Sequence, residues 1–323
     1  MKRKLTVLIS GLLVVVLMLG ACSSTAIKST EEEARVVGKI GDHDIRYEEL
    51  RYFTMSYKAA LEIKYGEGIF EDEAGAQYED MLMRLVSKKM VEKYAYIDLF
   101  QTRGIQFSDK ETEDAVEEYV QAYQSDLADG MSYADFLKSF YMTDWVFRHD
   151  LSLSSCQERY YEVLAEEQDA QARADVLAGK DFIRCRSIFI RNDPGESLSA
   201  NRKDAQTVRD ALVAGADIED YIGTKYDQTP AGNNDYYFMR GYYVEEYENA
   251  AFALEVGETS EVVEVLEGFY VIQRFPVEEQ YLNRNLEDMV TIYHICTMEN
   301  QMQEIAQMLS FELDEDISLW SMQ

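Results

Sequence analysis

The sequence predicts an α+β protein in which a mostly helical domain receives an inserted module of mixed strands and helices. Residues 47–165 repeat apolar positions at the spacings of three and four that are typical of amphipathic helices. Residues 181–275 instead alternate short strand-like and helical segments. Residues 282–308 are helical again, so the simplest arrangement packs them back onto the first helical domain, with the module inserted between.

The first residues predict export. Three basic residues are followed by an apolar run from Leu5 to Leu19, and then by Gly20, Ala21 and Cys22. The run is shorter than the roughly 20 apolar residues that span a bilayer, which argues against the alternative of a permanent transmembrane helix. The small residues before Cys22 resemble the lipobox of bacterial lipoproteins. We therefore expect residues 1–21 to be a signal peptide, Cys22 to carry lipid, and residues 22–35 to form a flexible tether.

The net charge of the chain limits the kinds of partner that the protein is expected to bind. The chain has 61 acidic and 31 basic residues, a net charge of −30, which argues against nucleic acid as a partner. A solvated acidic surface that keeps an exported protein soluble explains the excess. The alternative is an acidic face that attracts basic clients or divalent cations, although the sequence has no D-x-D-x-D-G loop to support it.

Cysteine and histidine predict neither a metal site nor a cofactor. Besides Cys22, the cysteines are Cys156, Cys185 and Cys296, without a C-x-x-C pair, so they indicate neither a disulfide framework nor zinc. The chain has only three histidines, which are scattered in sequence and are expected to be surface or packing residues.

The helical half opens with VVGKIGDHDIRYEEL, residues 36–50, which predicts a strand, a turn and the start of a helix. Residues 81–105 place eight apolar side chains near one helix face: Met81, Leu82, Leu85, Val86, Met90, Val91, Tyr94 and Ile97. Ser108, with Glu111 three residues later, predicts the N-cap of a further helix. Residues 132–151 add two short apolar stripes.

The second half predicts the order βααβαββ. Strands are expected at 181–191, 236–238, 260–265 and 268–275, and helices at 199–215, 218–226 and 245–254.

Residues 232–275 resemble the second half of a parvulin-type peptidyl-prolyl isomerase domain. The shared residues are Phe238, Arg240, Gly241, the run Ala250–Leu254, Val256-Gly257-Glu258, Ser260 and Gly268. Residues 36–50 resemble the opening of the PrsA and SurA chaperone families. Together these features resemble an exported foldase lipoprotein of the PrsA type. The resemblance implies a helical chaperone domain over residues 36–178, a parvulin-like domain over 179–277, and a C-terminal helix over 278–323 that packs on the first domain.

The resemblance also implies where catalytic groups should fall. Parvulins resemble one another in using two facing histidines and a neighbouring acid or cysteine. Here those positions are occupied by Ser187, Tyr270 and Thr229. The pocket for the proline ring would fall at Tyr243, Tyr247 and Phe252, beside Phe238. No histidine lies between His149 and His294, so the imidazole pair is absent.

Two interpretations of Tyr270 stay open: an aromatic side chain that packs the sheet, or a hydroxyl that substitutes for imidazole. The leading functional hypothesis is a chaperone or foldase, lipid-anchored on the outer face of the bacterial cell membrane, that binds unfolded exported polypeptides and has little isomerase activity. A second copy of the chain, in a homodimer, is a further candidate partner. The second hypothesis is a working isomerase with a remodelled Ser/Thr/Tyr site. The third is a solute-binding lipoprotein, against which the sequence shows no pair of repeated βαβ lobes.

Overall fold

The computed structural model describes residues 29–71, 75–128, 130–229 and 235–322. The expected signal peptide and Cys22 lie outside the described residues. The chain divides into two compact units, each described here by itself. The helical unit comprises Met1–Ala60, Gly68–Val163 and Gln301–Gln323, and the sheet unit comprises Leu61–Glu67 and Leu164–Asn300. The domain limits expected from the sequence, at 178 and 277, remain predictions.

The helical unit is built mainly from helices, with one small sheet. Its elements are the strands β1 (Val36–Ile40), β2 (His43–Arg46) and β7 (Phe311–Leu313), and the helices α1 (Tyr47–Tyr65), α2 (Ala76–Gln101), α3 (Lys110–Asp126), α4 (Tyr133–Ser139) and α5 (Asp144–Leu177), of which α1 and α5 run on into the sheet unit. The sheet has the antiparallel order β2-β1-β7. A side chain at Gly38 could not fit there, because its Cβ would lie 2.2 Å from the carbonyl oxygen of Glu312. Neither β7 nor β2 was predicted as a strand.

The predicted apolar face of α2 is confirmed. Leu82, Val86 and Met90 are completely buried, and none of the eight residues predicted to share this face is exposed. The predicted N-cap of the next helix is wrong by one residue. α3 begins at Lys110 with Asp109 in the cap position, and the Asp109 carboxylate accepts a hydrogen bond from the Gln106 amide instead of from its own helix.

The sheet unit follows the predicted order of elements. They are β3 (Ile183–Arg191), α6 (Leu198–Val213), the 3₁₀ turn η2 (Ile218–Asp220), β4 (Asp235–Phe238), α7 (Glu245–Ala253), β5 (Val263–Glu264), β6 (Gly268–Phe275), α8 (Glu279–Arg284) and α9 (Leu286–Ala306), of which α9 runs on into the helical unit. The four strands are antiparallel in the order β4-β3-β6-β5. The expected α+β class is therefore confirmed. The second predicted helix is only one 3₁₀ turn, and β5 has two residues where six were predicted.

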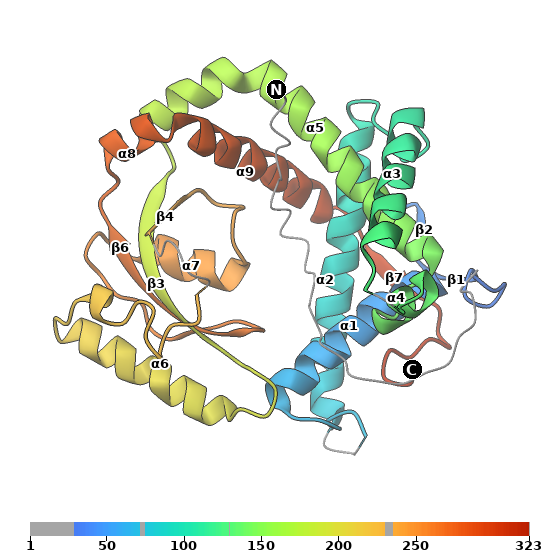
Figure 1. Cartoon of the computed structure of the whole chain (residues 1–323), viewed down its shortest axis with the longest axis horizontal. Coiled ribbons are helices and arrows are strands. Elements are labelled where there is room, and N and C mark those ends of the chain that lie inside the picture. The colour runs from blue at the N-terminus through green and yellow to red at the C-terminus, as the bar shows by residue number, and fades with distance from the viewer. Residues whose placement is uncertain (1–28, 72–74, 129, 230–234, 323) are drawn as a thin grey trace. The chain divides into compact units, whose positions relative to one another are not determined.

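The two faces of this sheet are covered by different helices (Figure 1). On one face Ile188 and Val271 pack with Val208 of α6. On the other face Cys185 and Ile272 pack with Ala251 of α7. This division follows from the alternation of side chains along β3 and β6. The residues expected to form the isomerase site all belong to the α7 face or its edge.

A third layer within the sheet unit covers the outer strand β4. Phe182 and Tyr237 pack against Ala172 and Val176 of α5 and against α8 and α9. The ring of Tyr237 stacks on that of Tyr281 in α8, with centroids 4.0 Å apart and an interplanar angle of 5°. The helical segments that flank the module in sequence therefore supply part of its core.

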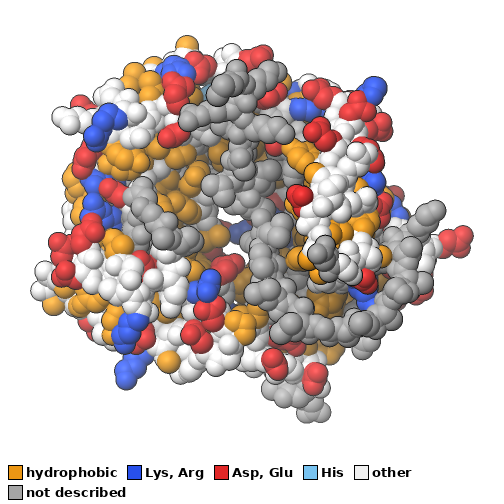
Figure 2. All heavy atoms as spheres, in the orientation of Figure 1, with side chains coloured by type: hydrophobic (Ala, Val, Ile, Leu, Met, Phe, Trp, Pro, Cys, Tyr) orange, Lys and Arg blue, Asp and Glu red, His pale blue; other side chains and the backbone are white. Residues whose placement is uncertain are grey.

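Acidic side chains are spread over the face shown in Figure 2 and do not gather in one patch. This distribution suits a solvated surface. Among the described residues, no helix combines the length and apolar character that crossing a bilayer requires.

Candidate functional site

The candidate site is a cluster of aromatic and hydroxyl side chains between α7 and the sheet. β3 supplies Ser187, β6 supplies Tyr270, and α7 supplies Tyr247. Ser187 pairs with Ile272 across the two strands and Phe189 pairs with Tyr270, so Ser187 and Tyr270 share a face and are offset by two positions. The structure therefore brings together the two positions where the resemblance expects histidines.

Tyr247 occupies the space between them. Its hydroxyl donates a hydrogen bond of 3.5 Å to the Ser187 Oγ, and its ring meets that of Tyr270 edge-on at a centroid distance of 5.0 Å. Tyr247 is 3% exposed and Ser187 is 1% exposed. Burial raises the pKa of the Tyr247 phenol well above its usual value, so the group stays a neutral donor near neutral pH.

Tyr270 is held by packing. Its ring stacks on Phe189 of the neighbouring strand, with centroids 4.4 Å apart and an interplanar angle of 25°. The pKa of Tyr270 is raised by burial, so its hydroxyl is also un-ionised near neutral pH. This geometry favours the packing interpretation of Tyr270.

The remaining pocket positions form an aromatic group around Phe238. Tyr243 meets Phe238 edge-on at 4.9 Å and lies 4.9 Å from Tyr247. Phe252 meets Phe238 edge-on at 5.8 Å, and the guanidinium of Arg240 covers the ring of Phe252 at 4.4 Å. Tyr243 and Phe252 are half-buried, whereas Phe238 is fully buried. Phe238 therefore acts as core, and Tyr243 and Phe252 are the members of this group that a ligand could reach.

Thr229 lies at the edge of the site and is accompanied by an acid that was not predicted from the sequence. The Thr229 hydroxyl donates to Asp227 Oδ1 at 2.5 Å, and the same carboxylate accepts from the backbone amides of Gly223, Phe189 and Thr229. Asp227 is buried and joins this loop to β3 beside Tyr270. The sequence signal was the D-x-T spacing, in which an aspartate caps the amide two residues later.

A second buried acid shapes the entry to α7. The Glu248 carboxylate accepts hydrogen bonds of 2.8 to 3.0 Å from the backbone amides of Gly241, Tyr242 and Tyr243. Gly241 has a φ of 94°, and a Cβ there would lie 3.2 to 3.3 Å from Glu299, Asn300 and Cys296. Glu248 thus positions Tyr243, and the sequence analysis did not identify it.

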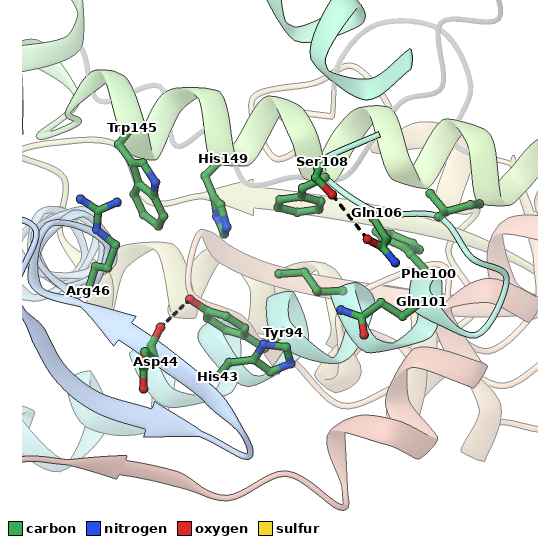
Figure 3. A pocket seen from close by; sticks show the side chains of 13 residues that line it. His43, Asp44, Arg46, Tyr94, Phe100, Gln101, Gln106, Ser108, Trp145 and His149 are labelled. Atoms are coloured by element: carbon green, nitrogen blue, oxygen red, sulfur yellow. Dashed lines mark hydrogen bonds between the residues drawn. The ribbon is translucent and has the colours of Figure 1, made fainter. Parts of the chain in front are cut away.

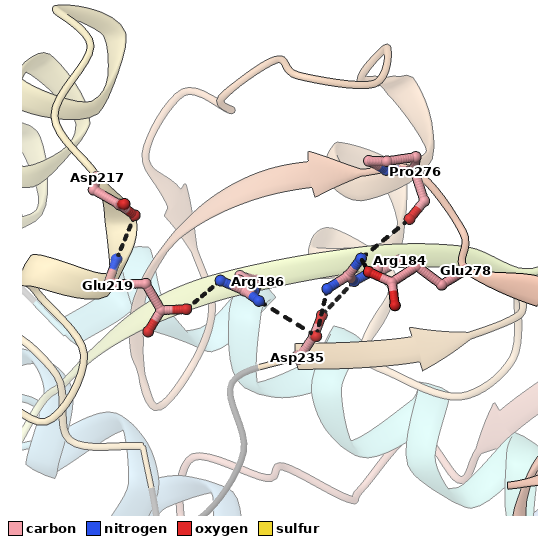
Figure 4. Close-up of polar contacts among 7 residues, drawn as sticks. All are labelled: Arg184, Arg186, Asp217, Glu219, Asp235, Pro276 and Glu278. Atoms are coloured by element: carbon pink, nitrogen blue, oxygen red, sulfur yellow. Dashed lines mark hydrogen bonds and ion pairs between the residues drawn. The ribbon is translucent and has the colours of Figure 1, made fainter. Parts of the chain in front are cut away.

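An ion-pair cluster joins β3 to the outer strand β4 and to the segment that follows β6 (Figure 4). The Arg184 guanidinium makes two parallel contacts of 2.7 Å with the carboxylate of Asp235 on β4, and it also pairs with Glu278 beyond β6. Arg186 pairs with Glu219 and lies 3.5 Å from Asp235. Burial alone would raise the pKa of Asp235, but the hydrogen bonds and charge of Arg184 outweigh it and hold that pKa below its ordinary value. Because these charged groups pair with one another, the cluster fixes the positions of β3 and β4. It leaves little unpaired charge for a ligand.

This arrangement presents aromatic surface, but it has limited means to polarise an amide. It offers half-buried rings and neutral hydroxyls, and it contains no imidazole, because all of its side chains come from residues 187–270 and no histidine occurs between residues 150 and 293. No group of three or more potential metal ligands occurs among the residues that the structure describes.

Comparison with known protein families agrees with the resemblance that the sequence predicted. Residues 1–137 match the family model described as the SurA-like N-terminal domain. This match agrees with the predicted SurA-like helical domain, and the element order of the sheet unit is the order that the sequence predicted for the parvulin-like module.

Among individual proteins, the chain is similar to the foldase protein PrsA of Halalkalibacterium halodurans, with 34% identity over 95 residues. The match spans 28% of this chain and 28% of that relative. The predicted resemblance to PrsA and SurA is therefore confirmed.

Two similar solved structures have low sequence identity to the chain. PrsA from Bacillus subtilis is 17% identical, with 90% of this chain and 98% of that chain covered and a TM-score of 0.29. A structure of the SurA-like chaperones PEB4 and Cj1289 of Campylobacter jejuni is 14% identical, with 87% and 99% covered and a TM-score of 0.30.

Proposed function

We propose that this protein is a chaperone or foldase outside the cytoplasm, held at the membrane by lipid on Cys22, that binds unfolded exported polypeptides and has a prolyl-isomerase module of little or no activity. The SurA-like match at residues 1–137 and the similarity to a foldase protein support the chaperone class. The lipobox-like residues before Cys22 support export and anchoring.

The observation that carries the proposal is the contact between Tyr247 and Ser187. Rotation about a peptide bond has a barrier of about 18–20 kcal/mol, and an isomerase must stabilise the twisted amide with well-placed polar groups. Here the first histidine position is a buried serine that is capped by a buried tyrosine. Loss of one such donor typically costs about 2.7–4 kcal/mol of transition-state stabilisation, so loss of two imidazoles should leave a slow catalyst.

The second candidate, a working isomerase with a remodelled site, is favoured by one specific observation. The hydroxyls of Ser187, Tyr247 and Tyr270 lie on one face, and the Asp227–Thr229 pair lies at its edge. The third hypothesis, a solute-binding lipoprotein, has no comparable support. The two sheets formed by the described strands are antiparallel, whereas βαβ lobes require parallel strands.

A paired assay separates the two candidates. The purified protein should suppress aggregation of an unfolded client while accelerating proline isomerisation little in a protease-coupled assay. Tyr270→Phe should change neither result. Rapid isomerisation that disappears in Tyr270→Phe would reject the inactive module and establish the remodelled site. Failure to suppress aggregation would reject the chaperone proposal itself. Light scattering on the same sample tests whether a homodimer forms.

The anchor is tested separately in the native host. Cys22→Ser should release the protein from the membrane fraction or leave it as uncleaved precursor. One acyl chain binds a membrane only marginally, so at least two are expected on Cys22. Fully processed Cys22→Ser protein that stays in the membrane fraction would rule out the lipid anchor without affecting the chaperone proposal.

A further inference from the structure

The helical unit contains a pocket that is independent of the isomerase site. It has a volume of about 360 Å³, near the lower end of the range of roughly 300–1,000 Å³ that is typical of small-molecule sites. β2, α2, the segment before α3, and α5 line it (Figure 3). All residues that line the pocket belong to the helical unit.

Aromatic rings form much of its wall. Trp145 and His149, one turn apart on α5, stack with centroids 4.5 Å apart and an interplanar angle of 20°. The guanidinium of Arg46 lies over the ring of Trp145, 4.1 Å from its centroid. Phe107 meets His149 edge-on at 4.8 Å, and Tyr94 lies across the pocket from them (Figure 3). Such walls favour a flat ring, which buries apolar area against them at little entropic cost.

The charges that border the pocket are already paired. Arg46 lies 2.5 Å from the buried carboxylate of Glu48. His43 Nε2 lies 2.7 Å from Asp98 Oδ1, and the Tyr94 hydroxyl donates to Glu49 Oε2 at 2.7 Å. A charged ligand would have to lose its hydration without finding a free counter-charge, which is unfavourable. The pocket therefore selects for neutral ligands.

His149 supplies the polar contact. Its ring points into the pocket in Figure 3, and its side chain is 17% exposed. Its Nδ1 is buried, has no hydrogen-bond partner among the described residues, and lies 3.6 Å from the fully buried Glu49 carboxylate. That carboxylate favours the tautomer with the proton on Nδ1, which leaves a lone pair on Nε2. A ligand N–H or O–H group can donate to that lone pair.

We propose that this pocket binds a small neutral ligand that consists of a flat ring with one N–H or O–H donor, of the phenol or indole class, with the ring against Trp145 and Tyr94 and the donor on His149. The ligand can be a free molecule or a side chain on a polypeptide, because both present the same group. The site is separate from the Tyr247 cluster and does not depend on the isomerase activity of the module.

The test compares p-cresol with its methyl ether, two probes that differ in the O–H group. Binding to the full-length protein is measured by calorimetry, and quenching of Trp145 fluorescence in a Trp320→Phe background reports whether the probe reaches this pocket. Trp145 and Trp320 are the two tryptophans of the chain. We expect p-cresol to bind more tightly than the ether by a factor on the order of ten, the value of one neutral hydrogen bond. Equal affinities in the unsubstituted pocket would overturn the proposal, whether or not any variant folds.

His149→Phe keeps a ring on Trp145 but removes the acceptor, so the two probes should then bind equally. Tyr123→Phe is the matched control, because it changes an exposed ring of the same unit outside the pocket and should preserve the preference. A preference for p-cresol that persists in folded His149→Phe would also overturn the proposal. Competition between p-cresol and N-acetyl-tyrosinamide would assign the ligand to polypeptide side chains, and the lack of competition would assign it to free small molecules.

Discussion

The hydroxyl of Tyr247 lies 3.5 Å from the hydroxyl of Ser187, and both side chains are almost completely buried. One residue replaces an expected catalytic imidazole, and the other replaces part of the expected proline pocket. Their contact links α7 to β3 through the core of the module. Substitution of Tyr247 should therefore mainly lower the stability of the module. Substitution of the half-buried Tyr243 or Phe252 should mainly weaken peptide binding.

We expect Tyr247→Ala to destabilise the protein by about 3–5 kcal/mol, because it removes a fully enclosed ring. Tyr247→Phe should cost at most about 1.5 kcal/mol, since only a long hydrogen bond is lost. Tyr243→Ala should instead weaken peptide binding to the module. Urea unfolding and peptide titration measure the two effects. Tyr221→Ala, on the α6 face of the sheet, is the control for binding. If it weakens binding as much as Tyr243→Ala, peptides do not bind on the α7 face.

Glu248→Gln should destabilise the entry to α7. The carboxylate accepts from three backbone amides, and a glutamine would turn either one oxygen or an N–H₂ group toward them. We expect a loss of about 1–3 kcal/mol in the free energy of unfolding and faster amide exchange at residues 241–243. Glu246→Gln, on the exposed side of the same helix turn, should stay within about 0.5 kcal/mol. Similar losses in both variants would mean that the charge of α7, and not this cap, matters.

The pair of Arg184 and Asp235 should be energetically coupled. Its geometry is bidentate, and its side chains are 9% and 21% exposed. A double-mutant cycle with Arg184→Met and Asp235→Asn should give a coupling energy of at least about 1 kcal/mol. The exposed pair of Lys110 and Asp114 provides the comparison, with an expected coupling of at most about 0.5 kcal/mol. Equal coupling in the two pairs would show that the Arg184 cluster is held together by other contacts.

Mild acid should destabilise the helical unit through His149. Burial, with the nearby charges of Lys93 and Arg46, lowers the pKa of His149 to about 2. The unfolded chain, with a histidine pKa of about 6.5, therefore binds a proton in mild acid that the folded chain does not bind. Stability should be fully present above pH of about 6.5 and fall by up to about 1.4 kcal/mol per pH unit below it.

Unfolding measured between pH of about 7 and 5, above the usual range of carboxyl groups, checks this. The slope should decrease in His149→Phe and persist in Tyr123→Phe. An unchanged slope in folded His149→Phe would show that another group titrates.

The module should be more stable with its flanking helices than without them. Phe182 and Tyr237 pack against Val176, Leu282 and Met289, all of which lie outside residues 179–277. We expect residues 164–300 to resist limited proteolysis and to unfold cooperatively. Residues 179–277 alone should fold with lower stability. Equal stability of the two fragments would show that the third layer contributes little.

Much of the fold follows from local patterns. The apolar spacing in residues 81–97 predicts the buried face of α2, and the alternation in Gly268–Phe275 predicts β6 with its observed bounds. The short strand β7 and the cap of α3 could not be predicted from such local patterns. β7 has three residues, and it becomes a strand only because β1 offers it a partner. The cap at Asp109 depends on the turn that precedes α3, which residue spacing alone does not specify.

For this protein, the sequence alone determined the absence of imidazole from residues 150–293 and the order of elements, because these depend on residue identity and on periodicity along the chain. Only the tertiary structure decided that Tyr247 covers Ser187, that Asp227 accompanies Thr229, and that His149 lies in a pocket with Trp145. Each of these facts depends on side chains from different elements, whose distances are fixed by packing and strand register and not by spacing in sequence.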